Sequence, residues 1–250
     1  MTRLAFPTDE HRPFHDGRAV ELAMQIVRDF DPDVLITGSD ALDFYAISTF
    51  DKNPFRLKAG GLQQEIDDWL AAQRAWRDAA PRARKRFIPG NHEDRLRRYL
   101  WTHPEIADLE ALQLPELLQF DTLGIEWDDQ ESSEVVIDEQ LVIKHGRFAR
   151  KFSAASASGE LENERHAISG LSGHTHRGGT YLAQTRRGLV QWVEAFCLCR
   201  LDPEYIDRPD WQQGIVLATV HGGLVSIEAV PFHDFRCRKV AVWRGREYLA

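Results

Sequence analysis

Two polar stretches, Gly90-Asn91-His92-Glu93 and Gly173-His174-Thr175-His176, decide how this sequence is interpreted. Each stretch follows a short run that fits a β-strand, residues 85–88 and residues 167–171. In open α/β sheets, ligands bind beyond the carboxyl ends of the strands, so polar side chains gathered there indicate a binding site. The two stretches therefore predict an α/β chain with a ligand or metal site at its strand ends.

Three further predicted strands are followed by side chains of the same kind. The strand at 3–6 is followed by Asp9 and His11, the strand at 34–37 by Asp40 and Asp43, and the strand at 141–144 by His145. We expect these loops to converge with the first two on one place. Carboxylate and imidazole ligands without a thiolate suit Mn, Fe or Zn, and they argue against a structural zinc site built from cysteines.

Two of the motifs place metal-binding side chains at alternate positions, Asp9-x-His11 and His174-x-His176. In an extended segment, alternate side chains lie on the same side of the chain. Each pair is therefore expected either to grip a single ion or to divide between two adjacent ions.

The rest of the chain predicts strands and helices in alternation. Residues 17–30 place apolar side chains three and four apart, which predicts a helix with one buried face. This helix joins strands 3–6 and 34–37 through short connections, which implies a parallel pair with a right-handed crossover. Further expected elements are a helix at 61–79, a helical stretch at 93–118 interrupted by Pro104 and Pro115, a hairpin of strands 134–137 and 141–144, and an antiparallel meander from Tyr181 onward.

The sequence also leads to expectations about one polar segment and about the domain organisation. Residues 153–159 are small and polar, which predicts a mobile loop or, alternatively, the start of a loosely packed helix. We expect residues 1–250 to form a single domain with a helical insert at about 93–120.

Composition and charge exclude several classes of protein. With 43 % hydrophobic residues the chain is not expected to be disordered, and no stretch approaches the roughly 18–20 apolar residues of a membrane span. A formal net charge of −8 argues against a surface that grips nucleic acid everywhere. Clusters of arginine and lysine within 82–86, 95–98 and 147–151 predict a basic rim suited to an anionic substrate, or else a solvated face. Three cysteines that cannot all pair favour a reduced, cytoplasmic location.

In this order and spacing, the five motifs between residues 9 and 176 resemble those of the calcineurin-like metallophosphoesterase family. The stretches 90–96 and 174–177 look like those of its bacterial and phage-borne members. The resemblance implies an α/β fold, a four-layer αββα sandwich of two mixed β-sheets flanked by helices.

The resemblance also implies a centre of two divalent metal ions, with Mn²⁺ preferred and Fe, Zn, Ni or Mg as alternatives. The implied ligands are Asp9, His11, Asp40 and His176 for the first ion, and Asp40, Asn91, His145 and His174 for the second. Asp40 would thus bridge the two ions. Ser39 stands where the family has a glycine before this aspartate. Either Ser39 tolerates the turn or the loop is reshaped, and Asp43 is then the alternative bridge.

The implied activity is hydrolysis of phosphodiester bonds in nucleotides or nucleic acid. Two cations roughly 3.5–4 Å apart neutralise the phosphoryl oxygens and lower the pKa of a bridging water, so that hydroxide is available to attack. His92 is expected to act as general acid, while Asp43 fixes its tautomer and raises its pKa. Arg147 and Arg177 are expected to contact the phosphate, or alternatively to form surface ion pairs.

Two other functions stay open on the sequence alone. One is a phosphomonoesterase that acts on small molecules or proteins, although Asp43-Phe44-Tyr45 departs from the Asp-Arg-Gly run of protein phosphatases. The other is a catalytically silent scaffold. The expected partner is the phosphoester substrate, and no interaction with a membrane is expected. The stretch 93–118 with Trp101 is expected to cap the site or to form a homodimer face.

Overall fold

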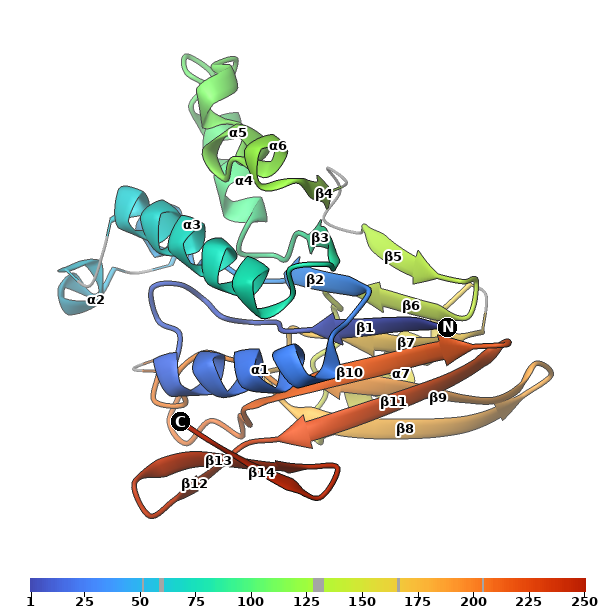
Figure 1. Ribbon diagram of the computed structural model, residues 1–250. Helices are drawn as coiled ribbons and strands as arrows, with labels where there is room; N and C mark the ends of the chain where they lie inside the picture. The colour runs from blue at the N-terminus through green and yellow to red at the C-terminus, as the bar shows by residue number, and fades with distance from the viewer. Residues whose placement is uncertain (51, 59–60, 128–132, 166, 204) are drawn as a thin grey trace.

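Two mixed β-sheets form the centre of the molecule (Figure 1). The computed structural model describes residues 1–50, 52–58, 61–127, 133–165, 167–203 and 205–250. The first sheet has the order β11-β10-β1-β2-β3-β4. Its strands are β1 (Thr2–Phe6), β2 (Val34–Gly38), β3 (Arg84–Ile88), β4 (Ile125–Trp127), β10 (Gly214–His221) and β11 (Leu224–Pro231). Strands β1 to β4 run parallel, whereas β10 and β11 join antiparallel beside β1.

The second sheet has the order β5-β6-β7-β9-β8. Its strands are β5 (Glu134–Ile137), β6 (Leu141–Lys144), β7 (Ser169–Ser172), β8 (Gly178–Thr185) and β9 (Gly188–Ala195). Strands β6, β7 and β9 run parallel, while β5 and β8 pair antiparallel at the two edges. The parallel crossover from β1 to β2 and the hairpin of β5 and β6 confirm the sequence predictions.

Helices cover the outer faces of both sheets, so the four layers expected from the resemblance are confirmed. Helices α1 (Gly17–Phe30) and α3 (Leu62–Ala79) pack on the first sheet through a core that includes Leu22, Ile26 and Trp76. Helix α7 (Ala155–Glu162) packs on the second sheet against Trp192. A third core lies between the sheets and joins side chains such as Phe6 and Ile143.

Helix α1 shows how the local sequence sets these layers. Asp16 caps its N-terminus, because the side chain accepts hydrogen bonds from the backbone N–H groups of Arg18 and Ala19. Asp31 ends the helix with a φ of 50°, a left-handed conformation that aspartate tolerates better than most residues. The apolar face between these ends is buried. The helix therefore begins and ends where the sequence pattern predicts.

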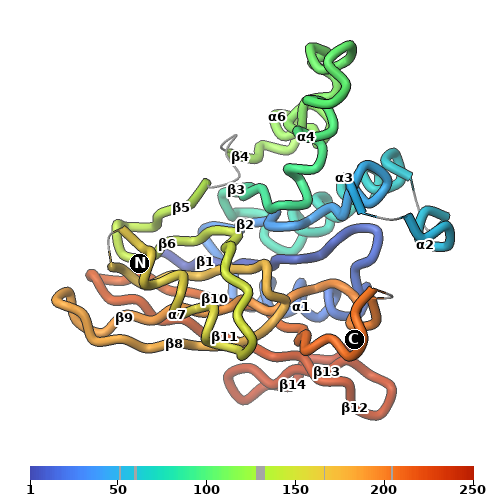
Figure 2. The backbone as a smooth tube through the Cα atoms, turned by 180° about the vertical axis from the view of Figure 1, so that it is seen from behind, coloured from blue at the N-terminus to red at the C-terminus, as the bar shows by residue number. Residues whose placement is uncertain are grey.

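The helical stretch after β3 is divided into short pieces that stand above the sheets in Figure 1 and Figure 2. They are α4 (Asp94–Thr102), the 3-10 turn η2 (Glu110–Leu112), α5 (Leu114–Leu117) and α6 (Phe120–Leu123). Their apolar side chains share a core with Trp69, Phe87 and Phe120. Pro115 lies in the first turn of α5, so it begins a helix rather than interrupting one.

Two expectations about elements need correction. Residues 155–162 form α7, so the alternative of a helix is confirmed and a loop throughout 153–159 is wrong. The antiparallel pairing expected from Tyr181 onward is confirmed in β8 with β9 and in β10 with β11. These strands do not form one meander, however, since β8 and β9 end the second sheet while β10 and β11 join the first. The C-terminal residues form a separate small sheet of β12 (His233–Phe235), β13 (Arg238–Trp243) and β14 (Arg246–Leu249). This small sheet packs onto α1 and against β11.

Two short elements and one shifted strand start complete the description of the residues that the structure covers. Strand β7 begins at Ser169, two residues later than the predicted strand at 167. The 3-10 turn η1 (Tyr45–Ile47) and helix α2 (Pro54–Lys58) lie between β2 and α3. Among the described residues, no helix combines the length and the apolar character that crossing a membrane requires.

Candidate metal centre

The loops that follow five strands bring the predicted ligand side chains together. Asp9 and His11 follow β1, Asp40 follows β2, Asn91 follows β3, His145 follows β6, and His174 and His176 follow β7. The first three strands belong to one sheet and the last two to the other. The side chains therefore meet at one end of the sandwich, where both sheets present the carboxyl ends of parallel strands.

A first group consists of Asp9, His11 and His176, whose ligand atoms all lie within 4.8 Å of one another. The Nε2 atoms of His11 and His176 are 2.9 Å apart, and Nε2 of His176 lies 3.3 Å from Oδ1 of Asp9. All three residues are buried. Their nitrogen and oxygen atoms thus point at one small volume, as ligands of a single cation would.

A second group consists of Asp40, His145 and His174, again within 4.8 Å. The Nε2 atom of His145 lies 2.9 Å from Oδ1 of Asn91 and 3.1 Å from Nδ1 of His174. Of the two predicted pairs, Asp9-x-His11 thus stays within one group, while His174-x-His176 divides between both groups.

One oxygen of Asp40 links the two groups. Its Oδ2 lies 3.8 Å from Nε2 of His11 and 3.5 Å from Nε2 of His145. Its Oδ1 accepts a hydrogen bond of 2.8 Å from the backbone N–H of His92. Asp43 lies apart from the second group, and its carboxylate pairs with Arg56 at 2.7 Å. This geometry favours Asp40 over Asp43 as the bridging carboxylate.

Left-handed backbone conformations turn the ligand side chains toward the centre. Six residues of the site adopt positive φ although none is glycine: Asp9 (53°), His11 (49°), Ser39 (56°), Asp40 (62°), His174 (71°) and His176 (57°). Such conformations are costly and cluster at functional sites. An extended backbone, which was expected to bring the side chains of each pair together, is therefore not the reason that they meet. They meet because the chain twists sharply at each ligand.

Two glycines allow the loops to approach the carboxylates. A Cβ atom on Gly90 would overlap the Oδ1 atom of Asp40, and a Cβ atom on Gly173 would overlap the Oδ2 atom of Asp9. Each glycine thus has a steric reason to stand in its motif, because any side chain there would push a carboxylate out of the site.

Ser39 tolerates the turn at which the family has glycine. It keeps its left-handed φ of 56° and is fully buried. Its Oγ lies 2.8 Å from Nδ1 of His145. A hydrogen bond at Nδ1 holds the ring so that Nε2 faces the second group, which is the usual role of such an outer partner of a metal-binding histidine.

Glu93 has a role at the site that was not predicted, since an acidic residue at the start of a helix ordinarily interacts only with the helix dipole. Its carboxylate is buried and accepts hydrogen bonds from the backbone N–H groups of Gly90, Asp40 and Leu42. Burial, followed by the charge of Asp40, raises the pKa of Glu93 to about 7. Glu93 therefore fixes the loops after β2 and β3 against each other.

The electrostatics of the two groups suit cations. Burial comes first among the causes that raise the pKa of Asp40 to about 6, and the charge of Asp9 adds to it. Burial alone would also raise the pKa of Asp9, but interactions with His11 and His176 outweigh it and hold that pKa well below its usual value. Two buried carboxylates that face imidazole nitrogens and an amide oxygen are a donor set that fits divalent metal ions.

His92 lies beside the linked groups but differs from its expected environment. Its Nδ1 is 3.1 Å from the backbone oxygen of Asp43, and the carboxylate of Asp43 is more distant, at 3.8 Å. Arg95 lies 2.9 Å from Nε2 of the same ring. Burial first, then the neighbouring charges of His11 and Arg95, lower the pKa of His92 well below its usual value. The expected increase in this pKa is not seen, because burial outweighs the charge of Asp43, which by itself would raise it.

The two arginines expected to contact phosphate are placed differently. Arg147 is exposed, and its guanidinium lies over the ring of Phe148. Arg177 is buried and donates hydrogen bonds to the backbone oxygens of Lys151 and Arg150. The guanidinium of Arg177 therefore holds the loop before α7. Its Nε lies 3.9 Å from a carboxylate oxygen of Glu194, so the ion pair that it forms is buried and not at the surface.

Two cysteines lie behind His176. Cys197 and Cys199 are buried, and Sγ of Cys199 lies 3.7 Å from Nδ1 of His176. Burial raises the pKa of Cys199 well above its usual value. His176 thus turns Nδ1 toward Cys199 and Nε2 toward His11, so the thiol supports the ring in the orientation that the first group requires.

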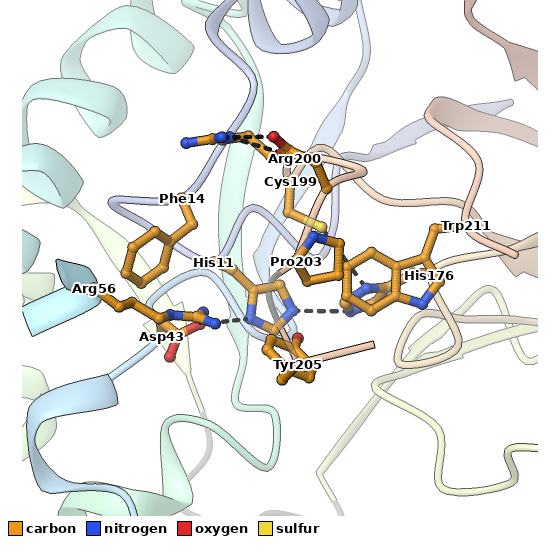
Figure 3. Close-up of a pocket in the computed structure, with 11 residues that line it drawn as sticks. His11, Phe14, Asp43, Arg56, His176, Cys199, Arg200, Pro203, Tyr205 and Trp211 are labelled. Atoms are coloured by element: carbon orange, nitrogen blue, oxygen red, sulfur yellow. Dashed lines mark hydrogen bonds and ion pairs between the residues drawn. The ribbon is translucent and has the colours of Figure 1, made fainter. Parts of the chain in front are cut away.

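An aromatic cavity adjoins the first group. His11, Asp43 and His176 line one side of it, and Phe14, Tyr205 and Trp211 line the others (Figure 3). The ring of Trp211 packs on His176, with centroids 4.2 Å apart. Nothing in the local sequence pattern of Trp211 indicates that it shares a site with His176, which lies more than thirty residues earlier in the chain.

Comparisons with known proteins give structural likenesses alone, as no family model and no curated protein match the chain. The matching solved structures include Vps29 from Chaetomium thermophilum, with 9 % identity, 100 % of this chain and 92 % of that chain covered, and a TM-score of 0.48. A single mutant of Vps29 from Entamoeba histolytica matches with 9 % identity, 99 % of this chain and 97 % of that chain covered, and a TM-score of 0.44. Vacuolar protein sorting 29 from Cryptosporidium parvum matches with 11 % identity, 100 % of this chain and 95 % of that chain covered, and a TM-score of 0.43. With TM-scores below 0.5, none of these likenesses carries an argument about function.

Proposed function

We propose that this protein is a phosphoester hydrolase that uses two divalent cations and acts on phosphodiester bonds of nucleotides or nucleic acid. One observation carries the proposal above the others. The Oδ2 atom of Asp40 lies between an imidazole of the first group and an imidazole of the second, at 3.8 and 3.5 Å. A carboxylate shared between two sets of ligands is what a pair of adjacent cations requires.

The donor set assigns the ligands. The first ion would be held by Asp9, His11, Asp40 and His176, and the second by Asp40, Asn91, His145 and His174. When bound, the two cations would neutralise the phosphoryl oxygens and make hydroxide available near neutral pH. Carboxylate, amide and imidazole ligands suit Mn²⁺ best among the candidates, with Fe, Zn, Ni and Mg as alternatives.

His92 is the residue that we propose as general acid. Its ring lies next to Asp40 without belonging to either ligand group, with Nε2 3.8 Å from Oδ2 of that carboxylate. Its pKa is low in the free protein. A dianionic or monoanionic phosphate beside the ring would raise this pKa, so that the imidazolium donates a proton to the leaving alkoxide. Asp43 contributes by holding the Nδ1 side of the ring through its backbone oxygen.

Arg95 completes the surroundings of this ring. It donates hydrogen bonds to the backbone oxygen and to the carboxylate of Asp43, at 2.6 and 3.1 Å. It therefore ties the loops after β2 and β3 together beside His92, and it adds positive charge where an anionic substrate would bind.

Hydrolysis of two chromogenic esters tests the proposal and its rivals. Metal-free protein is supplied with Mn²⁺ and offered bis(p-nitrophenyl) phosphate and p-nitrophenyl phosphate. We expect Mn²⁺-dependent turnover with the diester preferred, and a His92→Gln variant that loses about 10²- to 10⁴-fold in turnover. Isothermal titration calorimetry should find Mn²⁺ binding intact in this variant.

His233→Gln is the matched control, because His233 is exposed on β12, far along the chain from the ligand motifs. A preference for the monoester would favour the phosphomonoesterase. A protein that binds Mn²⁺ but hydrolyses neither ester would be a scaffold, and the proposed function would be wrong.

A further inference from the structure

The aromatic cavity beside the first ligand group has a volume of roughly 180 Å³. Its base is formed by His11, His176 and Asp43, so it opens directly onto the metal centre (Figure 3). Drug-sized ligands occupy sites of about 300–1,000 Å³. The cavity is therefore too small for a whole nucleotide and is suited to a single planar ring system.

The cavity walls are built from rings that come from distant parts of the chain. Phe14 lies after β1, whereas Tyr205 and Trp211 lie between β9 and β10. Trp211 and Tyr205 are 6.3 Å apart between centroids, with an interplanar angle of 61°. The guanidinium of Arg56 lies 4.0 Å from the centroid of Phe14 and 5.2 Å from that of Tyr205. Flat π faces on several sides recognise aromatic groups by stacking.

The charges at the cavity argue against a second anion as its occupant. Arg56 is paired with Asp43 at 2.7 Å. Arg200, at the rim, is paired with Asp202 through two hydrogen bonds of 3.0 and 2.7 Å. Both guanidinium groups thus have a carboxylate beside them. The paired polar groups at the rim offer donors and acceptors to the edge of a heterocycle, while the aromatic faces offer stacking.

From this size, these rings and these charges we infer that the cavity binds the nucleobase of a nucleotide whose phosphate lies at the metal centre. The inference rests on the proposed function and narrows its substrate class to esters that carry a planar heterocycle close to the phosphorus. Trp211 is the main stacking residue, because its ring also packs on His176 and so joins the cavity to the first ligand group.

Two ligands that differ only in the base test this inference. Adenosine 5′-monophosphate and ribose 5-phosphate are titrated calorimetrically into Mn²⁺-loaded protein. We expect the nucleotide to bind more tightly, by about 10- to 100-fold, since stacking of one base on an aromatic side chain accounts for a difference of this size. Trp211→Ala should abolish most of this preference, whereas Trp211→Phe should retain most of it.

Trp101→Ala is the matched control, because Trp101 is 66 % exposed on α4 and does not line the cavity. Tyr205→Ala, at a 61 % exposed residue, provides a second variant in which folding is not at risk. Equal binding of the two ligands, unchanged in both cavity variants, would overturn the nucleobase site and leave the metal centre untouched. Binding of neither ligand in the presence of Mn²⁺ would instead contradict the proposed function.

Discussion

The two halves of the candidate metal centre have different surroundings. Asp9, His11 and His176 are at most 7 % exposed, and both Cys199 and Trp211 contact His176. In the other half His145 is buried, but Asn91 and His174 are only half-buried. The first half therefore shares its walls with the aromatic cavity, while the second depends on Ser39 to orient a ligand. Asp40 is common to both halves. A substitution should therefore weaken metal binding in both halves or in only one of them, depending on which contact it removes.

The largest effect is expected from Asp40→Asn, which should break both halves at once. The substitution preserves shape but removes the shared negative charge. Loss of an outer partner of a metal ligand already costs about 10- to 100-fold in affinity, so loss of this ligand should exceed 100-fold for both ions. Calorimetric titration with Mn²⁺ measures the stoichiometry and both affinities.

Asp43→Asn is the matched comparison for this experiment, because Asp43 is equally buried and lies three residues away. It should leave both ions bound. If Asp43→Asn released the ions while Asp40→Asn retained two, Asp43 would be the bridge and the assignment made here would be reversed.

A smaller and one-sided effect is expected at Ser39. Both Ser39→Ala and Ser39→Gly remove the hydroxyl that lies 2.8 Å from Nδ1 of His145. Each variant should lower the affinity for one of the two Mn²⁺ ions by about 10- to 100-fold and leave the affinity for the other ion unchanged. Thermal unfolding should separate the two variants, since only glycine relieves the left-handed conformation, and Ser39→Gly should be more stable than Ser39→Ala by about 1 kcal/mol.

Ser39→Gly is thus the decisive variant of this pair. If it bound both ions as the wild type does, the hydroxyl would have no part in orienting His145. The difference between the two halves would then lie in exposure alone.

Much of the fold was predictable because its signals are local. The apolar spacing within Gly17–Phe30 and the acidic cap at Asp16 determine one helix without help from the rest of the chain. The division of the later strands was not predictable, because Leu189 and Leu217 belong to strands of similar pattern that join different sheets. Only packing between distant segments makes that choice.

The candidate site shows the same limit. The residue types and strand ends led to the ligand side chains, since each motif lies within a few residues of a predicted strand. The left-handed turns at Asp9 and His174, the three backbone hydrogen bonds of Glu93 and the approach of Trp211 to His176 were not predictable. Each of them depends on how loops from two sheets meet, which no local pattern encodes.

Anomalous diffraction from a crystal soaked in Mn²⁺ tests the shared carboxylate most directly. We predict two peaks, one among Asp9, His11 and His176 and one among Asn91, His145 and His174, with Asp40 in contact with both. A single peak, or a peak beside Cys197 and Cys199 instead, would contradict the account.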